Sequence, residues 1–217
     1  MKKLCIIFLT ILLLPVTGRA QNESVPKFTF GAEWGYIGVF YSGYHHNFFA
    51  PEGYRVDPRS YKFMYVSNAE AYLHLGYNID ARHNIAAYAG ISAIERYHHT
   101  IPVSVRFTRY SGDNHMKDRW FTFIDLGSGI SIKKNPQAIL TGKLGWGYRI
   151  SLSRDTKLDF LMSYRAVLTH PDIYHYGDMI PHDKVNRNNA YNSALSLGIA
   201  LTFDNIKQLL IWLSDSN

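Results

Sequence analysis

The run Tyr191-Asn-Ser-Ala-Leu-Ser-Leu-Gly-Ile-Ala-Leu-Thr-Phe203 alternates between two kinds of residue. Its even positions are small or polar, and its odd positions are mostly large and apolar: Tyr191, Ser193, Leu195, Leu197, Ile199, Leu201 and Phe203. Successive side chains of a strand point to opposite faces, so this alternation predicts a β-strand with one apolar face.

The same division recurs along most of the chain. Strand-like segments occupy 27–44, 68–79, 83–95, 101–110, 120–132, 138–152 and 157–169. The alternation of the first segment is clear up to Tyr36 and blurs after it, and a high alanine content hides the two faces of 83–95. With 191–203, eight strands are predicted.

These strands are long enough to cross a membrane. A transmembrane β-strand needs about 9 to 11 residues, whereas soluble strands most often have about 5 to 6. The interior of an eight-stranded barrel is just wide enough for side chains, so the small, polar face fits inside and the large apolar face belongs on the lipid side. The predicted fold is all-β: an eight-stranded antiparallel up-and-down transmembrane β-barrel over residues 21–203. A soluble lipocalin-like barrel is the weaker alternative, because large side chains would overfill it.

Composition agrees with one barrel domain. The 217 residues suit a single all-β domain, and no stretch reaches 18 consecutive apolar residues, so no membrane helix is expected. The net charge is +6, but three of the basic residues lie in the first 20 and no basic run follows. Nucleic-acid binding is therefore not expected.

The first 20 residues are read as a secretory signal peptide. Lys2 and Lys3 precede a mostly apolar run of about 13 residues, and small residues precede Gln21, as at a cleavage site. The only cysteine, Cys5, lies in this segment, so the mature chain has no disulfide. The sequence thus predicts export, with the outer membrane of a Gram-negative bacterium as the destination of such a barrel.

The terminal strand Ala194-Leu-Ser-Leu-Gly-Ile-Ala-Leu-Thr-Phe203 resembles that of small outer-membrane β-barrel proteins. The runs Ile101-Pro-Val-Ser-Val-Arg-Phe-Thr-Arg-Tyr110 and Phe123-Ile-Asp-Leu-Gly-Ser-Gly-Ile-Ser131 are similar to the "porin family" barrels common in Bacteroidetes. The resemblance implies a monomer that contacts outer-membrane lipid and lipopolysaccharide. It also implies that the barrel-insertion machinery reads the strand ending in Phe203, although residues 204–217 follow it here.

The tail 204–217 is predicted to lie on the periplasmic side and to form a short amphipathic helix. Its apolar residues have helical spacing, and Asp204 or Asn205 can cap the start: Ile206, Leu209, Leu210 and Leu213. Trp212 favours a membrane–water boundary. A continued strand or a disordered end is the alternative, since short helices are marginal in water.

The polar faces carry four acidic and four basic residues that we expect inside the barrel: Glu33, Glu70, Asp125, Asp159, Arg106, Lys143, Arg149 and Arg165. Unpaired buried charges are costly, so equal numbers of both signs predict a salt-bridged network that fills the lumen. An ion or proton path is the alternative function of these residues.

Segment lengths predict the orientation. Residues 45–66 and 170–189 are long, and external loops of outer-membrane barrels are longer than periplasmic turns. Aromatic and arginine side chains, which are typical of contact surfaces, occur in both. The candidate contact residues are His45, His46, Tyr54, Arg55, Tyr174 and His175.

Neither a catalytic site nor a cofactor is predicted. The histidine spacing matches no metal-site template. Lipid A deacylases place a His-x-Ser pair on a late strand. Here the residue two positions after His170 is Asp172, and the residue two positions after His175 is Gly177. The sequence therefore predicts a structural or surface-interaction role for a barrel with a filled lumen. A lipid A-modifying enzyme or a narrow channel is the alternative.

Overall fold

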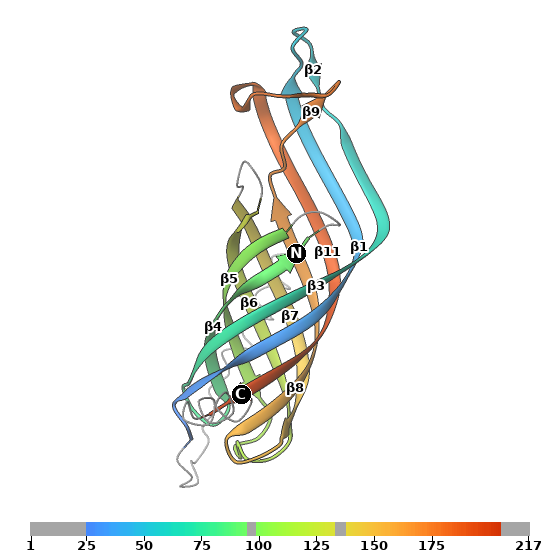
Figure 1. The fold of residues 1–217 in the computed structure, drawn as a ribbon. Coiled ribbons are helices and arrows are strands. Elements are labelled where there is room, and N and C mark those ends of the chain that lie inside the picture. The colour runs from blue at the N-terminus through green and yellow to red at the C-terminus, as the bar shows by residue number, and fades with distance from the viewer. Residues whose placement is uncertain (1–24, 95–98, 133–137, 205–217) are drawn as a thin grey trace, which may run out of the picture.

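The computed structural model describes residues 25–94, 99–132 and 138–204. It shows a single antiparallel β-barrel with a taller wall on one side (Figure 1). The predicted signal peptide 1–20 lies outside the described residues. So does the predicted helix of the tail, of which only Asp204 is described.

Eight long strands follow one another in sequence. Their bounds are β1 Phe28–Phe49, β3 Arg59–Asn78, β4 His83–Ala93, β5 His99–Tyr110, β6 Arg119–Ser131, β7 Ala138–Ser151, β8 Thr156–Thr169 and β11 Val185–Phe203. The short strands are β2 Arg55–Val56, β9 Tyr174–His175 and β10 Asp178–Met179, and a 3-10 turn η1 covers His182–Lys184.

The long strands close into a ring. Each pairs antiparallel with its neighbour in the chain, and β11 pairs antiparallel with β1 to complete the barrel. The prediction of an all-β, eight-stranded antiparallel barrel is confirmed. Within the described part of the chain, no helix is long and apolar enough to cross a membrane.

The two faces of the barrel are opposite in character to those of a soluble barrel. Large apolar side chains cover the outside, and Leu73, for example, is 70% exposed. Charged side chains lie inside, where Arg106 and Glu33 are buried. An apolar outer band and a polar interior are typical of membrane barrels, so the chemistry of the strands sets the direction in which they face.

Three strands continue past the others and form what we call the head, residues 43–62 and 170–189. Strand β4 pairs with β3 only as far as Glu70, and β8 pairs with β11 only from Ala190 onward. Beyond these points β1, β3 and β11 rise alone, with β2 and β9 at their far ends (Figure 1). The opposite end, which we call the rim, carries the turns 79–82, 111–118 and 152–155.

The predicted long loops 45–66 and 170–189 therefore include residues that belong to strands. Most of 45–66 belongs to β1, β2 and β3, and 185–189 belong to β11. His45 and His46 lie on strand β1, Arg55 on β2, and Tyr174 and His175 on β9. Backbone pairing continues in these segments, but the alternation of large and small residues does not. That alternation arises where one side of a strand faces lipid.

A register shift explains the blurred alternation of the first segment. Against both neighbouring strands, the pairing of β1 shifts between Val39 and Tyr41. Val39 pairs with Ala194, but Ser42 pairs with the inward-facing Asn192. The inward positions of β1 thus change from odd to even at this bulge, which a search for period two cannot follow.

Candidate functional site

Arg106 is the centre of the charge network inside the barrel. Its guanidinium donates to both carboxylate oxygens of Glu33, at 2.5 and 3.0 Å. It also donates twice to Asp125, at 3.1 and 3.0 Å, and once to the Tyr88 hydroxyl, at 3.1 Å. The cation lies over the rings of Tyr88 and Phe123, 4.0 and 4.4 Å from their centroids. One arginine thus pairs with two buried acids.

Glu70 organises a second group. Lys143 Nζ lies 2.7 Å from Oε1 of Glu70, and Arg165 lies 3.6 Å from Oε2. The hydroxyl groups of Tyr72 and Ser196 donate to the same carboxylate, at 3.2 and 3.0 Å. The cations need this acid, because Arg165 is 1% and Lys143 5% exposed.

A third group lies towards the rim. Arg149 donates to Asp159 through two bonds of 2.7 Å each. Lys157 donates to the carbonyl groups of Ser153 and Arg154, at 2.9 and 2.8 Å, and lies 3.9 Å from Asp204. Bidentate arginine–carboxylate pairs are strong and directional, so this end of the interior is also held by charge.

The structure therefore places all eight predicted interior residues inside the barrel and joins each to at least one oppositely charged partner. Sequence reasoning missed two aromatic partners of the network, Tyr72 and Tyr88. Tyr72 shares the parity of Glu70, which was a usable signal. Tyr88 lies in the alanine-rich strand whose faces were not distinguished.

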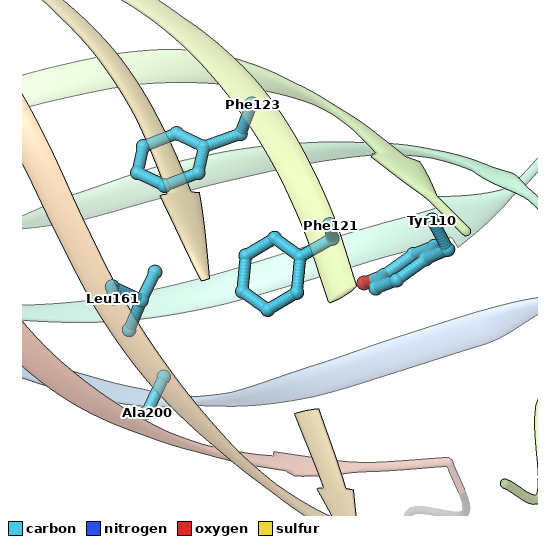
Figure 2. Packing of buried hydrophobic residues seen from close by; sticks show 5 residues of the cluster. All are labelled: Tyr110, Phe121, Phe123, Leu161 and Ala200. Atoms are coloured by element: carbon cyan, nitrogen blue, oxygen red, sulfur yellow. The ribbon is translucent and has the colours of Figure 1, made fainter. Parts of the chain in front are cut away.

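Apolar clusters pack in the interior on the head side of the charges and between the charged groups. Towards the head, one cluster contains Ile37, Val39 and Ala194, and another contains Ile94, Ile139 and Val167. Towards the rim, the side chains in Figure 2 pack across the lumen: Tyr110, Phe121, Phe123, Leu161 and Ala200. The interior cavity lined by His74 and Arg149 has a volume of about 20 Å³, which is enough for about one water molecule.

The head has an apolar centre of its own. Phe48, Ile173 and Ile180 are buried together, and Val56 and Val185 pack against them. Segment 170–184 is therefore folded onto strand β1. Its hairpin β9–β10 pairs His175 with Asp178 and Tyr174 with Met179.

His45 holds an ionic cluster on the head. Arg187 NH1 lies 3.2 Å from His45 Nδ1, and His45 Nε2 lies 2.8 Å from Asp57 Oδ1. A guanidinium can only donate, so Nδ1 accepts and the Nε2–H group donates to the carboxylate. This hydrogen bond, supported by Arg59, lowers the pKa of Asp57 below its ordinary value.

The other predicted contact residues divide into two kinds. Arg55 donates to Asn47 at 3.1 Å, and the ring of His46 packs on Tyr44 at 4.7 Å. Tyr54 and His175 meet across the head through a 3.1 Å hydrogen bond. Tyr174 is largely exposed. Tyr54 and Tyr174 are thus the exposed aromatic residues of this set, and Tyr54 contacts the half-buried His175.

Tyr176 belongs to the segment 170–189 that is predicted to carry contacts, next to Tyr174 and His175. It is 86% exposed at the turn between β9 and β10, with its ring 4.3 Å from that of His175. Its φ is 50° and that of Gly177 is 96°. Positive φ at both residues of a two-residue hairpin loop defines a type I′ turn, whose first position favours Asn, Asp or Gly. In the doublet Tyr176-Gly177 only the glycine is typical of this turn, so the sequence does not predict it clearly.

Among the residues that the structure describes, no group of three or more His, Cys, Asp or Glu side chains is placed to hold a metal ion.

Solved structures of outer-membrane proteins resemble the barrel. The outer membrane protein OprG from Pseudomonas aeruginosa superposes with a TM-score of 0.53 and 10% identity, covering 85% of this chain and 98% of that one. The N-terminal β-barrel domain of OprF from Pseudomonas aeruginosa gives 0.39 with 12% identity, covering 80% and 99%. Neisserial surface protein A gives 0.37 with 12% identity, covering 78% and 97%. No protein-family model and no curated protein matches the sequence.

Among the three structures named here, the likeness to OprG is close enough to support an argument, and at 10% identity it shows the fold alone. The fold is thus that of a small outer-membrane β-barrel protein, as predicted. Membership of a Bacteroidetes porin family is a finer assignment that these likenesses do not supply.

Proposed function

We propose that this protein is a non-catalytic barrel of the bacterial outer membrane that recognises a partner through its head. The apolar outer wall and the OprG-like fold support membrane insertion. In this orientation the head is extracellular, the rim is periplasmic, and the wall contacts outer-membrane lipid. We propose a monomer: the described ring is closed, so no strand of the barrel proper offers a free edge to a second copy.

The observation that carries a recognition role is Tyr176. A non-glycine residue in the left-handed region costs about 1–2 kcal/mol. The exposed ring of Tyr176 gains no burial that would offset this cost. Strain of this kind, found at an exposed position, is common at ligand contacts. The ring of His175 lies beside it, Tyr54 contacts His175, and Tyr174 is on the same hairpin. Tyrosines grouped in this way are typical of protein-binding surfaces.

The adhesion of cells that display the protein tests this role. Wild-type cells are offered a panel of immobilised proteins and glycans, and the bound partner is then offered to cells carrying Tyr176→Asn. Asn suits a type I′ turn, so the head stays folded while the ring is lost. We expect adhesion to fall at least about tenfold, as for a hot-spot residue.

Tyr77→Asn is the matched control, because Tyr77 is an exposed tyrosine at the rim end of β3, outside the head. It should leave adhesion unchanged. Equal adhesion by wild-type and Tyr176→Asn cells, with the head folded in both, would contradict the proposal.

A channel and a lipid A-modifying enzyme are the competing functions, and each has a direct test. The paired charges and the apolar clusters predict no steady conductance in a planar bilayer. Mass spectrometry of lipid A should show the same acyl chains with and without the protein. Open-channel steps, or a lost or gained acyl chain, would overturn this part of the proposal.

A further inference from the structure

The outer wall of the barrel is not uniformly convex. A hollow of about 530 Å³ crosses strands β5 to β8 and reaches β11. Its outward-facing lining is almost entirely apolar: Phe107, Ile124, Leu144, Trp146, Met162 and Leu195. On a wall that faces lipid, a hollow of this shape is filled by hydrocarbon, because no water is present there to fill it.

A second hollow, of about 650 Å³, joins the first at the rim. The two adjoin at Arg109, Thr122 and Trp146, and we refer to them together as the groove. The rim end of this groove has more polar surface than the rest, and Arg82, Ser111 and Gly112 line it beside aromatic side chains.

Strand register shows that the groove climbs away from the rim. Arg109 is the next-to-last residue of β5, at the rim end, and it pairs with Thr122 near the start of β6. Thr122 pairs with Trp146, and the neighbouring Leu144 lies at the middle of β7. Leu144 pairs with Tyr164, which pairs with Leu195. The groove thus begins beside a cation at the membrane boundary and ends at mid-membrane depth.

The rim end of the groove carries a pair of tryptophans and two arginines, which suit an anionic headgroup. Trp120 and Trp146 stack at 5.9 Å there, and tryptophan favours the headgroup level. Arg82 is paired with Asp113, which raises the pKa of the Arg82 side chain. A guanidinium has five N–H donors, so Arg109 can serve its contacts within the protein and still donate to a phosphate.

We propose that this groove binds one glycerophospholipid of the periplasmic leaflet, with the phosphate on Arg109 and an acyl chain along Leu144 towards Leu195. The arginine-lined rim end and the long apolar remainder match the charge distribution of that lipid. Lipopolysaccharide is not the occupant, because its headgroups lie at the other end of the barrel. The inference rests on the membrane insertion proposed above.

Native mass spectrometry of the full-length protein tests the site. The purified barrel is titrated with dioleoylphosphatidylglycerol, and separately with dioleoylglycerol, which has no phosphate. Wild-type barrel should retain one phospholipid. Arg109→Gln should weaken retention by about tenfold or more, the loss expected for a hydrogen bond between charged groups, without changing the retention of dioleoylglycerol. Leu144→Trp, which fills the groove, should weaken the retention of both.

Matched controls are available elsewhere on the same molecule. Arg59→Gln removes an arginine of the head, and Leu75→Trp enlarges an exposed leucine on the far side of the wall. Both should change retention by less than about twofold, as for surface substitutions away from a site. Unchanged retention by Arg109→Gln or by Leu144→Trp would overturn the proposal. Failure of the wild-type chain to float with lipid vesicles would instead contradict the proposed membrane insertion.

Discussion

At the scale of single residues, inward-facing glycines decide how closely the strands approach inside the barrel. A Cβ atom on Gly147 would lie 2.4 Å from the Phe160 carbonyl oxygen and 2.4 Å from the Phe121 ring. The carbonyl belongs to a paired strand and cannot move aside. On the same strand, Gly142 faces outward, and a Cβ atom there would meet its nearest neighbour, the Leu126 side chain, at 3.5 Å, which is ordinary contact.

Gly147→Ala should therefore destabilise the barrel by about 1–3 kcal/mol, as overpacking does. Gly142→Ala should be close to neutral. Urea titration of the refolded barrel in lipid vesicles measures both. Equal unfolding free energies for the two variants would show that the interior at Gly147 is looser than described.

Arg106 gives a second prediction at this scale. Replacing it with Met leaves Glu33 and Asp125 buried without their shared cation, and breaking a buried pair costs about 3–5 kcal/mol. Adding Glu33→Gln and Asp125→Asn removes the orphaned charges and should restore most of that loss in the same urea titration. If the triple variant were no more stable than Arg106→Met, lost packing rather than charge would explain the effect.

The residues of the interior were largely predictable, because alternation alone separates Asp125 and Lys143 from the outward side chains. Their partners were not. Alternation gives the face of a residue but not its height in the barrel, and height depends on the stagger between strands. The contact between Arg106 and Glu33 joins residues on β5 and β1, which are not adjacent strands.

At the scale of elements, the strands were predictable wherever one side faces lipid. The predicted and observed bounds of 138–152 and Ala138–Ser151 nearly coincide. The prediction failed beyond the bulge at Tyr41 and along 59–67, where both faces of the extended sheet carry aromatic or polar residues. A strand without an apolar face has no sequence period, although its backbone pairing is complete.

The head gives a pH-dependent prediction. The hydrogen bond from His45 lowers the pKa of Asp57. A carboxyl group with a lowered pKa stabilises the fold at every pH above its ordinary pKa of about 3.9. This contribution is lost as the pH falls through the lowered pKa. Packing of segment 50–58 should therefore weaken only in acid, below the ordinary range of Asp titration.

NMR titration of the Asp57 carboxyl carbon measures this shift. In His45→Phe the pKa of Asp57 should return towards its ordinary value, and Arg59→Gln should raise it less, because the contribution of Arg59 is smaller. A pKa that does not respond to His45→Phe would mean that the His45–Asp57 bond does not form in solution.

At the scale of the whole molecule, the chain builds two packed regions on shared strands. The barrel is held by its charge network and by the cluster in Figure 2. The head is held by the separate apolar cluster around Phe48. Strands β1, β3 and β11 pass through both regions (Figure 1). Regions with separate cores can open independently, and a mobile recognition surface can then sit on a rigid base.

Two buried phenylalanines allow this independence to be tested. Phe48 in the head is 2% exposed, and Phe121 in the barrel is 5% exposed. Truncation of a buried Phe to Ala costs about 3–5 kcal/mol. We expect Phe48→Ala to abolish amide hydrogen-exchange protection in 43–49 and 170–189 while residues 138–169 keep theirs. Phe121→Ala should lower protection throughout the barrel strands. If Phe48→Ala lowered protection equally in both regions, head and barrel would form one cooperative unit. Tyr176 would then be presented on a base as rigid as the barrel itself.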